Sequence, residues 1–325
     1  MQIVKNSISD LNLFGTAYAL VASYEMGLLQ AIVKNPNRTA SWYTMESTSV
    51  DVDAVEKLLG ILWTLGVVGH DPGKGDYWIS ERFSFLDDIL PGGLLSDIAI
   101  WVRMKEYAEN GEDSFDYDTA QSRDVVYEKK AFTVEKLYRD AAIILAKNLK
   151  PAQEQVLEIG AGSGVWGRAM IEALHPKVSC TVTFLDLPQV IAKTQANMPP
   201  KLTDRCHFVA CDYHHIDLER RYDTILIANV LHLENPPDAE LLLQGWIKSL
   251  LSSAPDAQVV IVDSFDMTDP IGHALYKVHL GMRHKGGHVH SMDQFTIWAQ
   301  SAGLKRSHMI QLGDPEVIKA MVFRR

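Results

Sequence analysis

One fifteen-residue segment, "VLEIGAGSGVWGRAM" (residues 156–170), constrains the fold more than any other part of the chain. It begins as an apolar strand, continues through a glycine-rich turn and ends in a helical pattern. Glycines at such a turn let the backbone approach a ligand closely, and the start of the following helix favours polar or anionic groups. The segment therefore predicts a strand–turn–helix unit that binds a small ligand at its turn.

The glycine spacing fits two cofactor patterns. Gly162, Gly164 and Gly167 match the G-x-G-x-x-G pattern of dinucleotide sites. Glu158 followed by Gly160, Gly162 and Gly164 matches the acid-x-G-x-G-x-G pattern of S-adenosylmethionine (SAM) sites. The turn alone does not separate the two, because both need the same backbone approach to the ligand.

Acidic residues near the ends of three successive strands distinguish the two cofactor patterns. Glu158 lies in the first strand, "TVTFLDL" ends near Asp186, and "CHFVACDY" ends near Asp212. SAM can use one acid at each of three places: the methionine side or first turn, the ribose and the adenine. A dinucleotide site needs only the ribose acid after its glycine turn. We therefore predict SAM as the cofactor.

Composition bounds the rest of the molecule. Before Pro151 the chain reads as helices with one short β-wing, and after it strands and helices alternate, which indicates a second, α/β domain. The net charge of −10, with no basic run, argues against nucleic acid as the main partner. We therefore expect a small-molecule partner. The three cysteines come without a secretion signal or membrane span, so we expect reduced thiols and a cytoplasmic protein.

The N-terminal part has an apolar helix and a β-wing. The segment "LNLFGTAYALVASYEMGLLQAI" predicts one helix with a wide apolar face. That face comprises Leu13, Phe14, Ala17, Leu20, Val21, Tyr24, Leu28 and Leu29. A second helix is expected to start at Asp51 or Asp53 and end near Gly66, followed by a hairpin at "DPGKG". Its acidic residues would repel phosphate, so a structural or dimerising role is favoured over DNA binding.

Five segments of the chain resemble, in the same order, those of the class I SAM-dependent small-molecule O-methyltransferases of the dimeric type. They are "YEMGLLQAI", "VLEIGAGSG", "FLDLP", "VACDY" and "ILIANVLHLEN". The resemblance implies a winged-helix-like dimerisation domain at 1–92, a helical linker and pocket lid at 93–150, and a Rossmann-like, doubly wound methyltransferase domain at 151–325. That domain would have a mostly parallel seven-stranded sheet. Its implied SAM-binding residues are Glu158, Gly160, Gly162, Gly164, Asp186, Leu187, Asp212, Tyr213 and Asn229. The implied assembly is a homodimer.

His232 matches the position of the family's general base. The family's segment usually reads His-Asp-Trp, but here it reads His232-Leu233-Glu234. A histidine, with an ordinary pKa of about 6.5, suits removal of a hydroxyl proton near neutral pH. Its orientation is expected to come from Glu234, or from Asp263 or Asp266 after the fifth strand.

An apolar acceptor pocket is expected beside the base. Its candidate residues are Trp101, Met104, Tyr107, Tyr276, His279, Met282 and Arg283. Five histidines fall within 273–290, but no zinc spacing is present, so pocket lining is favoured over a metal site. O-methylation of a hydrophobic, aromatic or polyketide-like metabolite is the favoured function. N- or C-methylation, or a non-methylating SAM-assisted reaction such as a pericyclic one, stays open.

Overall fold

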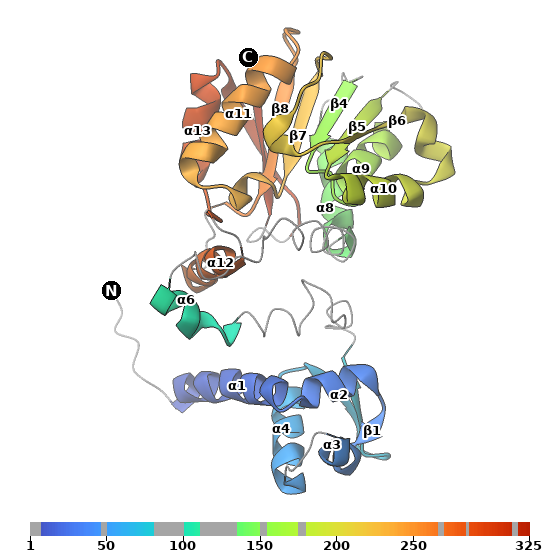
Figure 1. Cartoon of the computed structure of the whole chain (residues 1–325), viewed down its shortest axis with the longest axis vertical. Helices are drawn as coiled ribbons and strands as arrows, with labels where there is room; N and C mark the ends of the chain where they lie inside the picture. The colour runs from blue at the N-terminus through green and yellow to red at the C-terminus, as the bar shows by residue number, and fades with distance from the viewer. Residues whose placement is uncertain are drawn as a thin grey trace. The chain divides into compact units, whose positions relative to one another are not determined.

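The computed structural model describes residues 8–46, 51–80, 101–110, 135–149, 155–174, 180–265, 270–283, 286–313 and 318–325. Contacts divide the chain into two compact units, Met1–Lys105 and Glu106–Arg325, which are described separately (Figure 1). The helix α6 (Met104–Asn110) contains this division. The sequence-based boundaries at 92/93 and 150/151 stay predictions.

The first unit combines helices with a small antiparallel sheet. Its elements are α1 (Ile8–Glu25), α2 (Leu28–Lys34), β1 (Arg38–Thr39), α3 (Ala40–Glu46), α4 (Val52–Thr64), β2 (Val68–Asp71) and β3 (Asp76–Ile79), with strand order β1-β3-β2. The predicted second helix is α4, and Asp51 caps it by accepting a hydrogen bond from the Ala54 amide at 3.0 Å. The predicted wing is the β2–β3 hairpin.

The single helix predicted across residues 11–32 is wrong in one respect, because it is interrupted at Gly27. This glycine adopts a left-handed backbone with φ of 76°, which ends α1 and redirects the chain into α2. Leu28 and Leu29 are fully buried in the core of the unit, whereas Tyr18 on α1 is 61% exposed. The predicted face is therefore divided between two helices, although its residues Leu20, Tyr24, Leu28 and Leu29 all pack on the same core of this unit.

The second unit is built around a seven-stranded sheet. Its strands are β4 (Gln155–Ile159), β5 (Thr181–Asp186), β6 (Cys206–Ala210), β7 (Thr224–Ala228), β8 (Gln258–Asp263), β9 (Lys305–Gln311) and β10 (Lys319–Arg324). Its α-helices are α8 (Glu135–Asn148), α9 (Val165–Leu174), α10 (Pro188–Asn197), α11 (Pro236–Leu250), α12 (Pro270–Arg283) and α13 (Met292–Ser301), joined by the 3-10 turns η3 (Pro200–Arg205), η4 (Tyr213–His215) and η5 (Leu231–Leu233).

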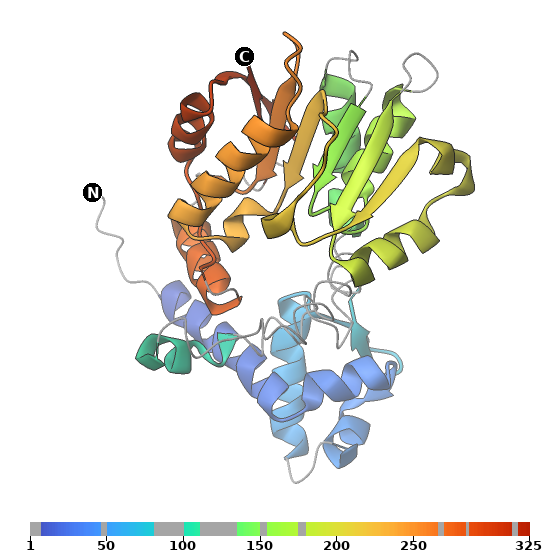
Figure 2. The same cartoon turned by 45° about the horizontal axis from the view of Figure 1, so that its top comes forward.

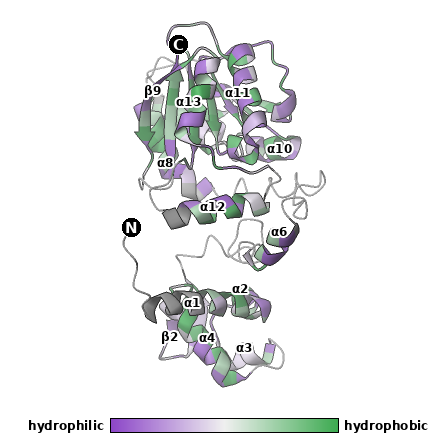
Figure 3. Ribbon diagram, turned by 90° about the vertical axis from the view of Figure 1, so that its left-hand side faces the viewer, coloured by the Kyte–Doolittle hydropathy of each residue, from purple (hydrophilic) through white to green (hydrophobic). Residues whose placement is uncertain are grey.

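The strand order β6-β5-β4-β7-β8-β10-β9 confirms the predicted doubly wound, mostly parallel sheet. Strands β4 to β8 are parallel, and β10 runs antiparallel between β8 and β9. Helices α8, α9 and α10 cover one face, and α11 and α13 cover the other (Figure 2). Buried on both faces, the central parallel strands β7 and β8 are nearly continuous apolar runs. The sheet of this unit is accordingly largely green in Figure 3.

The topology determines where a ligand can bind. The order of the strands reverses between β4 and β7, so their carboxyl ends flank the point at which the connections diverge. The glycine turn follows β4 there, and the segment with His232 follows β7. Within the described residues, no single helix is long and apolar enough to cross a membrane, and only the bent pair Gly15–Glu25 with Leu28–Lys34 passes by length and composition.

Candidate cofactor and active site

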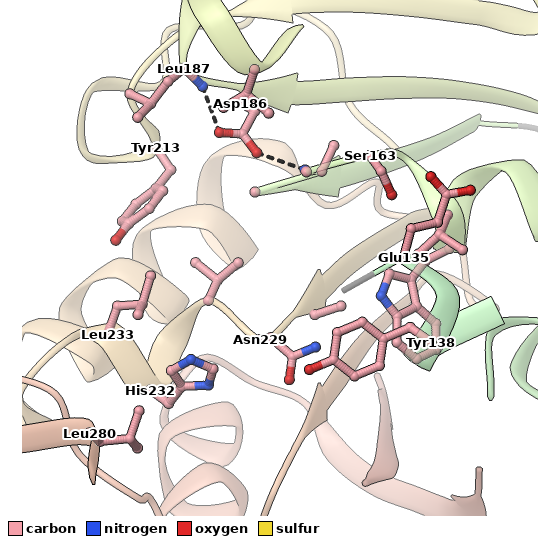
Figure 4. Close-up of a pocket in the computed structure, with 18 of the residues that line it drawn as sticks. Glu135, Tyr138, Ser163, Asp186, Leu187, Tyr213, Asn229, His232, Leu233 and Leu280 are labelled. Atoms are coloured by element: carbon pink, nitrogen blue, oxygen red, sulfur yellow. Dashed lines mark hydrogen bonds between the residues drawn. The ribbon is translucent and has the colours of Figure 1, made fainter. Parts of the chain in front are cut away.

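A cavity of about 300 Å³ opens at the carboxyl ends of the strands in the second unit (Figure 4). One part of its lining comes from the glycine turn and the loops after β5 and β6: Gly160, Ala161, Gly162, Ser163, Asp186, Leu187, Cys211 and Tyr213. The rest comes from α8, α9, α10, α12, the end of β7 and the segment after it: Glu135, Tyr138, Val165, Trp166, Val190, Ala228, Asn229, Val230, His232, Leu233, Tyr276, His279 and Leu280. The size and the apolar lining are those of a small-molecule site.

The glycine turn lines the cavity with backbone. Gly160, Gly162 and Gly164 have φ angles of 66°, 54° and 73°, which L side chains rarely adopt. A Cβ atom at Gly160 would also come within 2.4 Å of the Val230 side chain. Gly167 serves packing instead, because a Cβ there would come within 2.5 Å of Glu158 Oε2. The third glycine of the dinucleotide pattern thus holds α9 close to the sheet.

Asp186 presents a fixed carboxylate to the cavity. Its Oδ2 accepts a hydrogen bond from the Gly162 amide and its Oδ1 accepts one from the Leu187 amide, both at 2.7 Å. A carboxylate oxygen can accept more than one hydrogen bond, so hydroxyl groups of a ligand can also donate to it. Together with the turn, this arrangement fits the ribose diol of a nucleoside cofactor.

Glu158 lies beneath the turn and is not part of the cavity lining. Its side chain is almost completely buried on the side of the sheet that α9 covers. Oε2 accepts a hydrogen bond from the Gly167 amide at 3.0 Å, while Oε1 is buried without a partner. Burial raises the pKa of Glu158 to about 8, so the carboxyl group is neutral at pH 7.

Polar side chains after β6 form a hydrogen-bonded group with Glu234. Asp212 caps η4 through the His214 amide at 3.0 Å and is not among the residues that line the cavity. The Tyr213 hydroxyl donates to Glu234 Oε1 at 2.6 Å. Nε2 of His214 lies 3.0 Å from the same oxygen, and its Nδ1 lies 2.8 Å from Asp212 Oδ1. Glu234 therefore contacts Tyr213 and His214.

His232 forms a buried pair with Asp263. Nδ1 of His232 lies 2.9 Å from Oδ1 of Asp263, and the two residues are 8% and 3% exposed. The Ser264 amide donates to the same carboxylate oxygen at 2.8 Å. Asn229, which precedes the His232 turn, has a left-handed φ of 55° and lines the cavity. Asp266, the other predicted partner, lies outside the described residues.

The turn that carries His232 is held by the segment before α13. The His288 amide donates to the His232 carbonyl at 2.9 Å, and Nε2 of His290 lies 2.9 Å from the Leu231 carbonyl. His290 is buried among Phe295 and Trp298, and this burial lowers its pKa, so its ring is neutral. A neutral ring that donates from Nε2 fits the carbonyl contact.

Two tyrosines lie at the base side of the cavity. Tyr138 comes from α8 and contacts the Trp166 ring at 5.7 Å between centroids, and Tyr276 comes from α12 and meets the His232 ring edge at 6.5 Å. Burial raises the pKa of Tyr138 to about 12, and nearby Asp263 adds to this effect. Burial and Asp263 likewise raise the pKa of Tyr276 well above 10. Both phenols are therefore neutral hydrogen-bond donors.

The predicted acceptor residues fall into different places. Tyr276 and His279 line the cavity, whereas Met282 is fully buried and is not part of the lining. The Tyr107 hydroxyl lies against Gly281 of α12, where a Cβ would come within 2.5 Å. Met104 is 41% exposed, and neither it nor Trp101 lines the cavity. The side chain of Arg283, like His284 beside it, lies outside the described residues.

Glu135, Tyr138 and Trp166 line the cavity although the sequence did not suggest them. Glu135 forms an ion pair with Arg168. The sequence signal for Glu135 and Tyr138 is their spacing of one helical turn. Because ordinary helices show the same spacing, it does not indicate a site. In the part of the chain that the structure describes, no three His, Cys, Asp or Glu side chains come together as a metal site.

Comparison with known proteins identifies the family. A family model described as an O-methyltransferase domain matches residues 105–305, more than half of the chain. The chain belongs to the O-methyltransferase family and is a SAM-dependent O-methyltransferase. No curated protein matched the sequence.

Solved structures share the fold along almost the entire chain. The mitomycin 7-O-methyltransferase MmcR is 18% identical, with 98% of this chain and 96% of that one covered and a TM-score of 0.70. Human N-acetylserotonin methyltransferase in complex with SAM is 17% identical, with 100% and 99% covered and a TM-score of 0.70. The neocarzinostatin-biosynthesis O-methyltransferase NcsB1, solved with SAM and 2-hydroxy-5-methyl naphthoic acid, is 17% identical, with 95% of each chain covered and a TM-score of 0.68.

Proposed function

We propose that this protein methylates a hydroxyl group of a hydrophobic, aromatic or polyketide-like small metabolite, with His232 as the general base. The observation that carries the proposal is the buried His232–Asp263 pair at the cavity wall. The neighbours MmcR and NcsB1, named for natural-product methylation and biosynthesis, support an acceptor of this class. Aromatic and aliphatic side chains at the base side, Tyr138, Trp166, Val230, Tyr276 and Leu280, suit an apolar ring.

The proposed cofactor contacts follow the order of the strands. The glycine turn after β4 would hold the methionine side, Asp186 at the end of β5 would hold the ribose, and Tyr213 after β6 would hold the adenine. When bound, SAM supplies an electrophilic methyl group on a sulfonium. The main task of the protein is then to align the acceptor oxygen with that methyl carbon.

His232 would remove the acceptor proton. Asp263 accepts from Nδ1–H, which leaves Nε2 as the basic nitrogen. The buried carboxylate stabilises the imidazolium that forms when Nε2 takes the proton. Neutral Tyr138 and Tyr276 can donate hydrogen bonds to acceptor oxygens without competing for that proton.

Steady-state kinetics on an acceptor found by screening phenols and polyketides test this mechanism. His232→Gln should lower kcat by roughly 10²–10⁴, the usual contribution of general acid–base catalysis, while SAM affinity stays near the wild-type value. Asp263→Asn should also lower kcat. The low-pH decline of the wild-type rate should disappear in His232→Gln. Retention of most of the turnover by this variant would exclude His232 as the base.

The same proposal includes a homodimer formed through the N-terminal unit, a cytoplasmic location and a role in secondary metabolism. Exposed aromatic side chains in the N-terminal unit, Tyr18 on α1 and Trp63 on α4, support the dimer. Large exposed aromatic side chains are typical of surfaces that a partner chain covers.

A further inference from the structure

Glu234 stands where the family's segment usually has tryptophan, and its carboxylate contacts residues other than the proposed base His232. It follows β7 by a few residues, yet its carboxylate contacts Tyr213 and His214, which follow β6. In the sheet, β6 and β7 are separated by β5 and β4. Neighbouring strands lie about 4.8 Å apart, so the two loops start roughly 14 Å from each other.

The contact between these loops therefore crosses the carboxyl ends of β4 and β5. Those ends carry the glycine turn and Asp186, which form the cofactor part of the cavity. Tyr213 and Leu233, on the two sides of the contact, both line the cavity. In Figure 4, Tyr213 lies near Leu187 and Asp186, far from Tyr138 and Glu135.

Several contacts hold Glu234, His214 and Tyr213 in this arrangement. The Glu234 side chain is 14% exposed, and its Oε1 receives both the Tyr213 hydroxyl and Nε2 of His214. Nδ1 of His214 faces the Asp212 carboxylate, so this imidazole joins two acids. Nε1 of Trp246 on α11 donates to the Tyr213 carbonyl at 3.3 Å, and its ring meets the Tyr213 ring edge-on. Tyr213 is thus held at three points: its hydroxyl by Glu234, and its backbone carbonyl and the edge of its ring by Trp246.

We propose that Glu234 is a positioning residue for the cofactor: with His214 it ties the loop after β7 to the loop after β6 and holds Tyr213 as the wall of the adenosine end of the cavity. The proposal rests on the cofactor assignment made above. It assigns Glu234 to adenosine binding and leaves the orientation of His232 to Asp263.

Binding of three ligands that share adenosine tests the proposal. SAM, S-adenosylhomocysteine and 5′-methylthioadenosine would be titrated calorimetrically into the wild type, Glu234→Ala, Glu234→Gln and Tyr213→Phe. Loss of hydrogen bonds to a carboxylate should raise Kd about tenfold or more in Glu234→Ala, by the same factor for all three ligands. Glu234→Gln, whose carbonyl still accepts from the Tyr213 hydroxyl, should recover part of the affinity, and Tyr213→Phe should lie between it and Glu234→Ala.

Kinetics separate this role from an effect on the base. In Glu234→Ala the KM for SAM should rise with Kd, and kcat at saturating SAM should fall far less than in the matched control Asp263→Asn. Unchanged Kd in all three variants, a loss for SAM without a loss for 5′-methylthioadenosine, or a kcat loss with unchanged Kd would overturn the proposal. Thermal unfolding of each variant identifies one that is misfolded.

The outcomes also distinguish this proposal from the function on which it rests. A wild type that binds none of the three ligands removes the cofactor assignment and this proposal with it. An active His232→Gln variant removes only the base and leaves the role of Glu234 standing.

Discussion

Glu158 and Gly167 are joined by a hydrogen bond of 3.0 Å from the glycine amide to Oε2, in a contact that leaves no room for a Cβ atom on the glycine. The bond connects β4 to the first turns of α9 on the buried side of the glycine turn. The acid of the SAM pattern and the third glycine of the dinucleotide pattern therefore act together, as the packing that supports the turn.

The buried Glu158 carboxyl should make stability depend on pH. Its pKa of about 8 lies above the ordinary value of 4.5, so the folded protein holds the proton more tightly than the unfolded chain does. This contribution to stability is complete below about pH 4.5 and is lost as the pH rises through about 8. It is on the order of a few kcal/mol. Urea unfolding at pH 6 and pH 9 should show a smaller loss at pH 9 in Glu158→Gln than in the wild type, and equal losses would refute the assignment.

Gly167→Ala should destabilise the second unit. The added Cβ would come within 2.5 Å of Glu158 Oε2, 2.6 Å of the Phe184 ring and 2.8 Å of Val182. Forcing a methyl group into such a site typically costs about 1–3 kcal/mol. Gly245→Ala on α11 is the matched control, because nothing lies within 4 Å of its added Cβ, and it should be neutral or stabilising. The prediction fails if thermal unfolding ranks the two variants equally.

Asp186→Ala should weaken SAM binding. The substitution removes a carboxylate that the Gly162 and Leu187 amides hold at the cavity wall. Loss of a charged hydrogen-bond partner costs roughly 1–3 kcal/mol, or about 5- to 150-fold in Kd. Calorimetry measures it, with Asp256→Ala as a comparison, because Asp256 is exposed in the turn before β8 and does not line the cavity. Unchanged SAM affinity in Asp186→Ala, or tight NAD binding by the wild type, would contradict the cofactor contacts.

The protein should sediment as a homodimer at micromolar concentration. Tyr18 on α1 is 61% exposed in the single chain, and we expect a partner chain to cover it. Tyr18→Glu should shift the equilibrium toward monomer. Leu241→Glu, at a 71% exposed position on α11 in the other unit, should leave the sedimentation coefficient unchanged. A monomeric wild type would exclude the dimer.

Several elements followed from sequence because their determinants are local. Each apolar run of β4, β5, β7 and β8, and the cap that starts α4, depends on residues within a few positions of one another along the chain. Gly27 is an exception, since its left-handed backbone divides a helix that periodicity alone extends. A glycine within an apolar helical pattern does not by itself show which conformation it adopts.

The sequence by itself determined the α/β sheet, the glycine turn and the positions of Asp186 and His232 at strand ends, because apolar periodicity and glycine spacing encode them locally. Only the tertiary structure decided which acid meets His232. Glu234 is two residues away and Asp263 is thirty-one, yet Asp263 forms the pair. Strand β8 lies beside β7, whereas the backbone after His232 turns Glu234 toward the loop after β6. Strand order is set by the packing of the whole sheet, and no local pattern of residues records it.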